Sequence, residues 1–221
     1  DIGFAFDLDA DRLVIVINGK KMMPDATLGL GVVKALELGC KNFVLSQDTS
    51  VSIEKEIKQK GGTVFHSKVG EVNVADKMIN TKSQAGGEGS SGGFILSDFN
   101  YCRDGILTSG LIASIIRKDS FRNMLTFMEN YHIIRDKMEC ETKLHDELLK
   151  ILYNKMKEKY GDLETFDGIK AKIDEDSWVL IRKSNTENII RISAESNSLE
   201  TVRNIHQQTK ELIKQSYEQI N

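Results

Sequence analysis

The sequence has little proline and little cysteine. Its single proline, Pro24, gives no proline-rich linker, and its three cysteines are Cys40, Cys102 and Cys140. These cysteines lie far apart and form no Cys-x-x-Cys pair, so neither a disulfide framework nor a cysteine zinc site is expected. We interpret all three thiols as packing residues.

Long apolar runs and a strong net charge are also lacking. The longest aliphatic run, Leu13 to Ile17, is far shorter than the ~20 residues of a membrane helix, and no charged and then apolar leader opens the chain. With 30 Lys and Arg against 33 Asp and Glu, the net charge is −3, which gives no general attraction for nucleic acid or anionic lipid. We expect a cytoplasmic protein without nucleic-acid or membrane partners.

What is present is the composition of a soluble globular protein, with 40% apolar and 29% charged residues in 221 positions. This length suggests one large domain or two small ones. The first residue is Asp rather than Met, and the apolar stretch after it, residues 2–6, predicts a buried strand. We therefore expect a piece of a longer protein.

The spacing of apolar residues predicts two different halves. An acidic turn at 7–12 separates strands at 2–6 and 13–18. Helical spacing then alternates with short β-rich runs from 25 to 117, which predicts an α/β three-layer domain with a mixed or mostly parallel sheet. The expected helices are 27–38, one from 50 or 52 to 60, 72–80 and 104–117, and the expected strands are 43–45 and 63–66.

The second half is predicted to be a smaller α+β domain. After a connecting helix at 121–130, the order is strand, helix, three strands and helix: 131–141, 142–160, 168–174, 177–182, 189–194 and a last helix capped by Ser198. We divide the chain into 1–20, the tail of a preceding domain, 21–120, the α/β domain, and 125–221, the α+β domain.

Three carboxylates, those of Asp7, Asp9 and Asp11, alternate in the turn between the first two strands. Carboxylates this close repel one another unless a cation lies between them, and oxygen ligands favour Mg²⁺ or Ca²⁺. A solvated acidic turn is the alternative. An EF-hand does not fit, because it requires glycine where Arg12 stands and flanking helices.

A phosphatase interpretation uses the same residues. The stretch Phe4 to Asp9 resembles the haloacid-dehalogenase signature, an apolar strand followed by Asp-x-Asp, in which the first Asp attacks phosphorus. That family has Thr or Val at the place of Asp11, and an open loop where this sequence continues into a second strand.

Five glycines lie within residues 86–93, together with Glu88, Ser90 and Ser91. Glycine lets the backbone approach a ligand closely, and a carboxylate with two hydroxyls suits hydrogen bonding to sugar hydroxyls. A flexible linker is the alternative, although Glu88 and the apolar run 94–96 are unusual in a linker.

The stretch 182–188 is rich in hydrogen-bond donors. Within five residues it has a guanidinium, an ammonium, two hydroxyls and an amide, which suits a phosphate, and an ordinary polar hairpin is the alternative. We interpret Arg191, in the following strand, as a structural ion-pair partner. The candidate phosphate ligands are Arg182, Ser184, Asn185 and Thr186.

Taken in order, these three loops resemble those of the α-D-phosphohexomutases, the family of phosphomannomutase, phosphoglucomutase and phosphoglucosamine mutase. Its metal loop, Asp-Gly-Asp-x-Asp-Arg, matches residues 7–12 with Leu8 for Gly. Its sugar loop, Gly-Gly-Glu-x-Ser-Gly, matches 87–93 with one extra residue, so either Ser90 or Ser91 is the functional hydroxyl. Its phosphate loop, Arg-x-Ser-Gly/Asn-Thr-Glu-Pro, matches 182–188 with Asn188 for Pro.

The resemblance implies a four-domain enzyme that interconverts hexose 1-phosphate and 6-phosphate through a bisphosphate intermediate. This chain would keep the tail of the second domain, the third, and a fourth of the TATA-box-binding-protein-like type. The missing N-terminal domains would carry the phosphoserine nucleophile, so we expect this chain to be inactive alone. A phosphosugar-binding module without turnover, or half of a split enzyme, is the alternative.

The same resemblance implies the role of each candidate residue. Asp7, Asp9 and Asp11 would hold Mg²⁺, and Arg12 would contact the transferring phosphate or the sugar. Lys68, in a weaker match at 68–70, would be an acid/base or phosphate contact. Glu88 with Ser90 or Ser91 would bind sugar hydroxyls, and the loop beginning at Arg182 would anchor the non-reacting phosphate.

Overall fold

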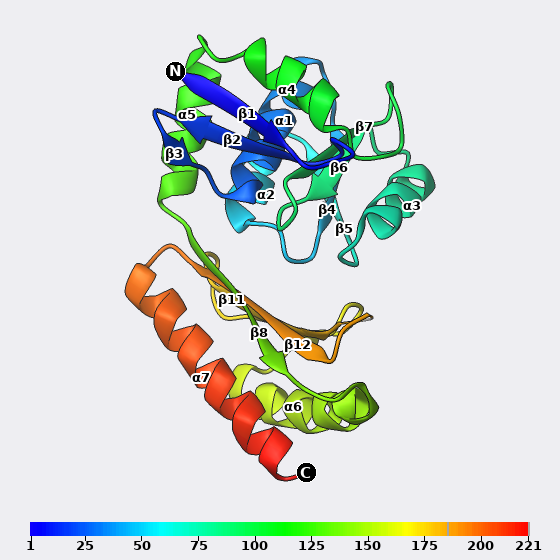
Figure 1. Cartoon of the computed structure of the whole chain (residues 1–221), viewed down its shortest axis with the longest axis vertical. Helices are drawn as coiled ribbons and strands as arrows, with labels where there is room; N and C mark the ends of the chain where they lie inside the picture. The colour runs from blue at the N-terminus through cyan, green and yellow to red at the C-terminus, as the bar shows by residue number, and fades with distance from the viewer. Residues whose placement is uncertain (185, 221) are drawn as a thin grey trace. The chain divides into compact units, whose positions relative to one another are not determined.

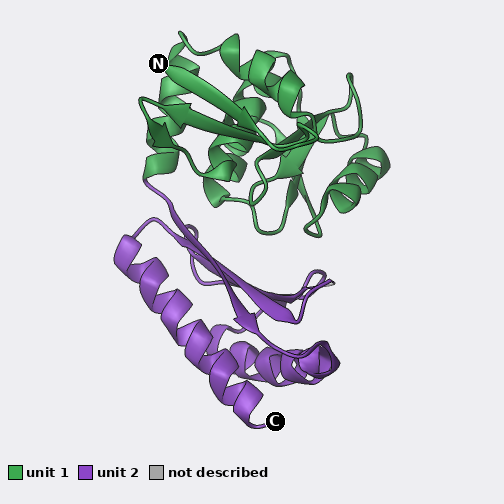
Figure 2. Cartoon of the chain, viewed as in Figure 1, with its two compact units in different colours: residues 1–129 green, residues 130–221 purple. Residues whose placement is uncertain are grey.

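A computed structural model describes residues 1–184 and 186–220, which form two compact units, 1–129 and 130–221 (Figure 2). Each unit has its own apolar core. In chain order, unit 1 contains β1 (Ile2–Phe6), β2 (Leu13–Ile17), β3 (Lys20–Lys21), α1 (Pro24–Glu37), β4 (Asn42–Ser46), α2 (Val51–Gln59), β5 (Thr63–Ser67), α3 (Glu71–Thr81), β6 (Ala85–Glu88), β7 (Gly93–Leu96), α4 (Gly105–Ala113) and α5 (Asp119–Glu129) (Figure 1).

The main sheet of unit 1 has the order β5-β4-β6-β7. Strand β4 pairs in parallel with β5 and β6, and β7 runs antiparallel to β6. Phe43 and Leu45 in β4 join the core formed with α1 and α2, whereas Val44 packs with residues of α3 on the opposite face. The predicted three-layer domain with a mixed, mostly parallel sheet is therefore confirmed.

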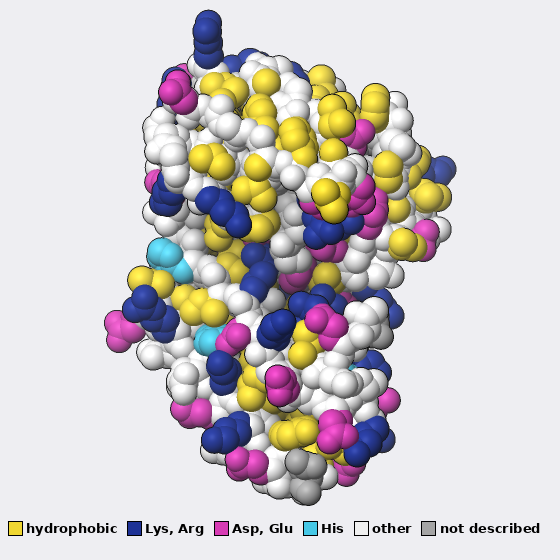
Figure 3. All heavy atoms as spheres, in the orientation of Figure 1, with side chains coloured by type: hydrophobic (Ala, Val, Ile, Leu, Met, Phe, Trp, Pro, Cys, Tyr) yellow, Lys and Arg dark blue, Asp and Glu magenta, His cyan; other side chains and the backbone are white. Residues whose placement is uncertain are grey.

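The first strands form a separate antiparallel sheet of order β1-β2-β3. Leu13 and Ile15 of β2 are fully buried against the core of unit 1, which fixes this small sheet to the domain. The predicted burial of β1 is wrong: its residues are half-buried or exposed, because β1 pairs with β2 alone at the edge of this sheet. Hydrophobic side chains remain visible on the surface of unit 1 around β1 and α4 (Figure 3).

The glycine-rich stretch is more ordered than its sequence predicts. Residues 85–88 and 93–96 pair as the hairpin β6–β7, so the connecting loop is only 89–92. Gly87 lies so close to the Gly93 carbonyl that a Cβ would collide with it. The glycines therefore serve close strand packing as well as the loop.

Two helix ends differ from prediction. Helix α1 begins at Pro24, because proline suits the first turn of a helix, where its missing N–H costs nothing. Helix α4 ends at Ala113 rather than near 117. Just after Ala113 the backbone forms a tighter turn, in which Ile115 N–H donates to the Ile112 carbonyl.

Unit 2 is an antiparallel sheet covered by two long helices. The strand order is β8-β12-β11-β10-β9, and every pairing is antiparallel. This confirms the predicted second domain and adds the short β9. Its elements are β8 (His132–Glu139), a 3₁₀ turn (Thr142–Leu144), α6 (His145–Tyr160), β9 (Leu163–Glu164), β10 (Ile169–Lys172), β11 (Trp178–Lys183), β12 (Ile189–Ser196) and α7 (Leu199–Glu218).

Alternation along β11 separates the two faces of this sheet. Val179 and Ile181 are buried in the core with residues of α6 and α7, while Trp178, Leu180 and Arg182 point to the other face. In the part of the chain that the structure describes, no helix has the length and apolar character needed to cross a membrane.

Candidate functional site

The hairpin between β1 and β2 brings the three predicted carboxylates together. One oxygen each from Asp7, Asp9 and Asp11 lies within 4.8 Å of the others. The loop turns sharply at Ala10, whose φ is 57°, and Ala10 N–H donates to the Asp7 carbonyl at 3.2 Å. Three carboxylate oxygens at this spacing are a donor set that suits a hard divalent cation.

Two arginines hold this acidic loop. Arg12 Nε lies 2.7 Å from Asp7 Oδ2 and 3.3 Å from Asp11 Oδ1, and its side chain is half exposed. Desolvation raises the pKa of Asp7, but the Arg12 backbone hydrogen bond and positive charge outweigh it and lower that pKa overall. Arg103, from the distant segment before α4, pairs with Asp11 Oδ2. This contact was not predicted from the sequence.

The predicted sugar loop places one carboxylate in a buried position. Glu88 ends β6 with only 8% of its surface exposed, and its Oε2 accepts a hydrogen bond of 2.6 Å from Gly70 N–H. Burial raises the pKa of Glu88, and the carboxylate of Asp48 adds to the rise. The backbone hydrogen bond from Gly70 and the charge of Arg103 oppose it.

The two candidate hydroxyls differ in their bonding. Ser91 Oγ donates to the Glu88 carbonyl and accepts from Gly93 N–H, both at 3.3 Å, so it supports the loop. Ser90 is half-buried, and its hydroxyl has no hydrogen bond to any residue that the structure describes. Ser90 is therefore the hydroxyl left available to a ligand.

Polar residues that were not predicted from the sequence lie at the carboxyl end of β4 and directly after it. Ser46 Oγ lies 2.7 Å from Asp48 Oδ1, and Thr49 Oγ1 accepts a hydrogen bond of 3.1 Å from Gly89 N–H. The available signal was the polar run 46–50 directly after the apolar residues 43–45, since ligands bind at the carboxyl ends of parallel strands. Lys68, after the neighbouring β5, is exposed, and its ammonium has no partner among the described residues.

The predicted phosphate loop joins β11 to β12 in unit 2. Ser184 is buried, and its Oγ accepts hydrogen bonds from the backbone N–H of Thr186 at 3.4 Å and of Glu187 at 3.2 Å. Asn185 lies outside the described residues. Asn188 replaces the family proline, and its Oδ1 accepts from Thr142 N–H at 3.2 Å and Thr142 Oγ1 at 2.6 Å.

Arg182 lies directly opposite Arg191 on adjacent strands. Arg191 forms the predicted ion pair, with Glu187, whereas Arg182 is half-buried and has no ion-pair partner among the described residues. Like charges directly opposite on one sheet face repel. An anion between them would be stabilised, because both positive charges would attract it.

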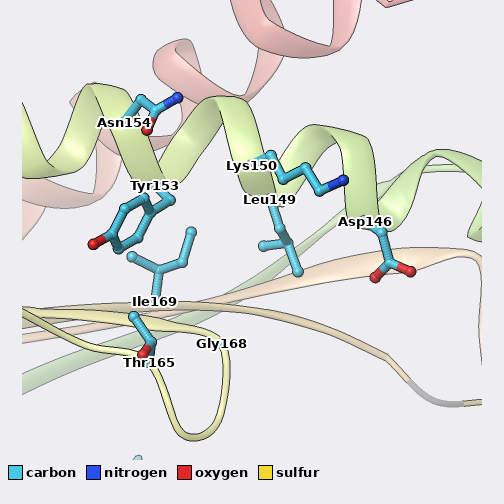
Figure 4. A pocket seen from close by; sticks show the side chains of 8 residues that line it. All are labelled: Asp146, Leu149, Lys150, Tyr153, Asn154, Thr165, Gly168 and Ile169. Atoms are coloured by element: carbon cyan, nitrogen blue, oxygen red, sulfur yellow. The ribbon is translucent and has the colours of Figure 1, made fainter.

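A separate groove of about 500 Å³ lies between α6 and the loop before β10 (Figure 4). Lys150 and Tyr153 of α6 border it, and Asp146 at its edge is paired with Lys183 Nζ at 2.7 Å. It is lined by none of the residues predicted from the three loops.

Comparison with family models identifies both units. Residues 24–131 match the model for phosphoglucomutase/phosphomannomutase, alpha/beta/alpha domain III, and 137–212 match the model for the C-terminal domain of the same family. The chain belongs to the phosphoglucomutase/phosphomannomutase family. Membership disfavours the haloacid-dehalogenase interpretation, which also lacks its open loop because β2 follows the acidic turn directly.

Curated relatives of this chain include two named "Probable phosphoglucosamine mutase". The protein of Methanopyrus kandleri is 32% identical over 224 residues, which cover 100% of this chain and 49% of that protein. The protein of Methanosphaera stadtmanae is 35% identical over 218 residues, 96% of this chain and 47% of that protein. The chain therefore spans about half the length of these relatives and is a C-terminal portion.

Solved structures share the fold of this chain. A phosphoglucomutase/phosphomannomutase family protein from Burkholderia thailandensis has a TM-score of 0.78 at 23% identity, covering 98% of this chain and 47% of that one. Aspergillus fumigatus N-acetylphosphoglucosamine mutase, in complex with GlcNAc-6P and magnesium, has a TM-score of 0.67 at 13% identity, covering 98% and 49%.

Proposed function

We propose that this chain is the C-terminal part of a phosphohexomutase that interconverts hexose 1-phosphate and 6-phosphate through a bisphosphate intermediate. The observation that carries the proposal is the close grouping of three carboxylates at the start of a chain whose two units both match this family. The half-length match to curated relatives supports a serine nucleophile that lies outside this chain.

Asp7, Asp9 and Asp11 would hold Mg²⁺, since they offer only carboxylate oxygens at mutual distances that one small cation can bridge. When bound, Mg²⁺ neutralises charge on the transferring phosphoryl group. Arg12 reaches the same place from the loop, and its half-exposed guanidinium can also contact that phosphate. In a complex of an Aspergillus structural neighbour, magnesium accompanies GlcNAc-6P.

Glu88 and Ser90 would bind sugar hydroxyls. Glu88 is held in place by Gly70, and Ser90 keeps its hydroxyl available, whereas Ser91 would act by shaping the loop. Lys68, exposed at the end of the neighbouring strand, would serve as an acid/base group or a phosphate contact.

The phosphate that does not react would be bound in unit 2. Arg182 offers a guanidinium without a partner among the described residues. Ser184 Oγ accepts hydrogen bonds from the backbone N–H groups of Thr186 and Glu187, which fixes the shape of this turn next to Arg182. Thr186 and Asn185 would complete this set. The proposed substrate is a hexose phosphate, with glucosamine, glucose and mannose phosphates as the compounds to compare.

The proposal is tested in two steps. Calorimetry on the 221-residue chain should detect glucose 1,6-bisphosphate binding that strengthens with Mg²⁺. A fusion to the N-terminal half of the Methanopyrus kandleri relative should then isomerise a hexose phosphate, while the chain alone should not.

Phosphate release from p-nitrophenyl phosphate by the chain alone would contradict the proposal, and so would absence of bisphosphate binding. Binding by a folded fusion without isomerisation would favour a non-catalytic phosphosugar-binding module.

A further inference from the structure

Arg103 connects two parts of unit 1 that are far apart in the sequence. It lies just before α4, and its Nη2 pairs with Asp11 Oδ2, 92 positions away along the chain. The same Nη2 lies 3.4 Å from Glu71 Oε2. Its backbone N–H donates a hydrogen bond of 2.7 Å to Glu71 Oε1. Arg103 is therefore held at its backbone and at its guanidinium by one carboxylate while it contacts another.

The environment of Arg103 fixes its side chain. Only 15% of the side chain is exposed, and it packs on Gly93, where a Cβ would collide with its Cδ. Its Nε is buried and has no hydrogen-bond partner among the residues that the structure describes. Burying a guanidinium with an unpaired N–H is costly, so the contacts with Asp11 and Glu71 must offset that cost.

Glu71 extends the connection to the proposed sugar loop. It is the first residue of α3, next to Gly70, whose N–H donates to Glu88. One short stretch, residues 70–71, thus contacts Glu88 through its backbone and Arg103 through its side chain. Arg103 in turn contacts Asp11.

We propose that Arg103 is a positioning residue that holds Asp11 in the orientation needed for cation binding, and that Glu71 in turn holds Arg103. The inference rests on the proposed function of the acidic loop. A carboxylate turns freely about its last bond, and a hydrogen-bonded partner on one oxygen fixes where the other oxygen points. Arg12 cannot supply this alone, because its side chain is 52% exposed.

The planar guanidinium is what this role requires. Arginine presents several N–H donors in a rigid fork, whereas lysine presents one compact ammonium on a flexible chain. A lysine at position 103 would keep the positive charge near the acidic loop but lose the rigidly held Nη2, the one atom that contacts both Asp11 and Glu71. Arg103→Lys therefore separates positioning from charge.

The test measures Mg²⁺ binding by calorimetry and Mn²⁺ binding by electron paramagnetic resonance, on the whole 221-residue chain. Arg103→Lys should weaken binding by about tenfold or more, the scale of lost support to a metal ligand. Arg122→Lys is the matched control, since Arg122 pairs with Asp119 on an exposed face of α5, and it should leave the affinity unchanged. Equal affinities of Arg103→Lys and the unsubstituted chain would overturn the inference.

Glu71→Asp gives a second test that also preserves charge. Its shorter side chain should release Arg103 and weaken Mg²⁺ binding at least threefold, although Glu71 is not one of the three carboxylates. If Arg103→Lys does not fold, as judged by circular dichroism, this variant decides, and an unchanged affinity overturns the inference. Asp9→Asn distinguishes the two proposals. If cation binding is unchanged in Asp9→Asn, the proposed metal site itself is wrong.

Discussion

Gly105 donates its backbone N–H to the carbonyl oxygen of Ala10 at 3.0 Å, which joins the first residue of α4 to the acidic loop. A Cβ at Gly105 would lie 2.7 Å from that oxygen and 2.9 Å from the Arg12 carbonyl oxygen. Both neighbours are backbone atoms and cannot move aside as a flexible side chain can. The acidic loop therefore keeps its place against α4 only with glycine at this position.

We expect Gly105→Ala to lower the free energy of unfolding by about 1–3 kcal/mol, the usual cost of overpacking, and to weaken Mg²⁺ binding. Urea denaturation and calorimetry measure the two effects. Gly110→Ala is the matched control, because Gly110 is in the same helix and its Cβ would meet open space. It should stabilise the protein by about 0.5–1 kcal/mol. Similar results for the two variants would contradict the close-packing argument.

Glu88→Gln should stabilise the fold and weaken ligand binding. The raised pKa of Glu88 means that its ionisation is less favourable in the folded chain than in the unfolded one. The unsubstituted chain should therefore lose stability relative to Glu88→Gln as the pH rises above about 4.5, the ordinary value. Gln can still accept the hydrogen bond from Gly70.

Thermal melts between pH 4 and pH 8 measure the stability difference, and calorimetry with glucose 1,6-bisphosphate measures binding. Loss of the charge-assisted hydrogen bonds should weaken binding roughly tenfold. A variant that melts earlier than the unsubstituted chain at pH 8 would show that the buried carboxylate is stabilising, contrary to this argument.

Glu54 should give the opposite dependence on pH. A hydrogen bond with His66 lowers its pKa to about 2, with further lowering by Lys58, although burial opposes the shift. Its contribution to stability is therefore present above about pH 4.5 and is lost as the pH falls toward 2. The free energies of unfolding of the unsubstituted chain and Glu54→Gln should converge between pH 6 and pH 3.

Urea denaturation at several pH values checks this convergence. Asp119→Asn removes an exposed helical ion pair with Arg122 and serves as control, with an expected change below about 0.5 kcal/mol at pH 6. A stability gap between Glu54→Gln and the unsubstituted chain that stays constant down to pH 3 would rule out the role of ionised Glu54.

Arg182→Ala should weaken binding of a hexose bisphosphate by about 2 kcal/mol, the scale of a charge-assisted contact. The folded state should not be destabilised, because Arg182 has no partner among the described residues and faces the like charge of Arg191. Arg203→Ala, an exposed arginine of α7, is the control and should bind as the unsubstituted chain does. An unchanged affinity for Arg182→Ala would show that this loop does not bind the phosphate.

Local sequence signals predicted much of the fold. Glu54 and Lys58, four residues apart in α2, form an ion pair of the kind that this spacing favours. Ser198 caps α7 as predicted, with its side chain accepting a hydrogen bond from Thr201 N–H. These features depend on neighbours within one helical turn, which a single sequence displays directly.

Long-range relationships could not be predicted in the same way. Apolar residues in β1 predict burial, but whether a strand is covered depends on its neighbours in space. The contact between Arg103 and Asp11 joins residues 92 positions apart, and no periodicity indicates it. For the acidic loop, alternation alone predicted that Asp7, Asp9 and Asp11 would converge, because one hairpin contains all three.

The facing arginines of β11 and β12 have a consequence for the whole of unit 2. Without a counter-ion, the positive charges of Arg182 and Arg191 repel each other in the folded sheet, and Glu187 forms an ion pair with Arg191 only. A bound dianion would offset that repulsion and would bind the folded sheet in preference to the unfolded chain. The melting temperature of residues 130–221 should therefore rise as the phosphosugar concentration rises.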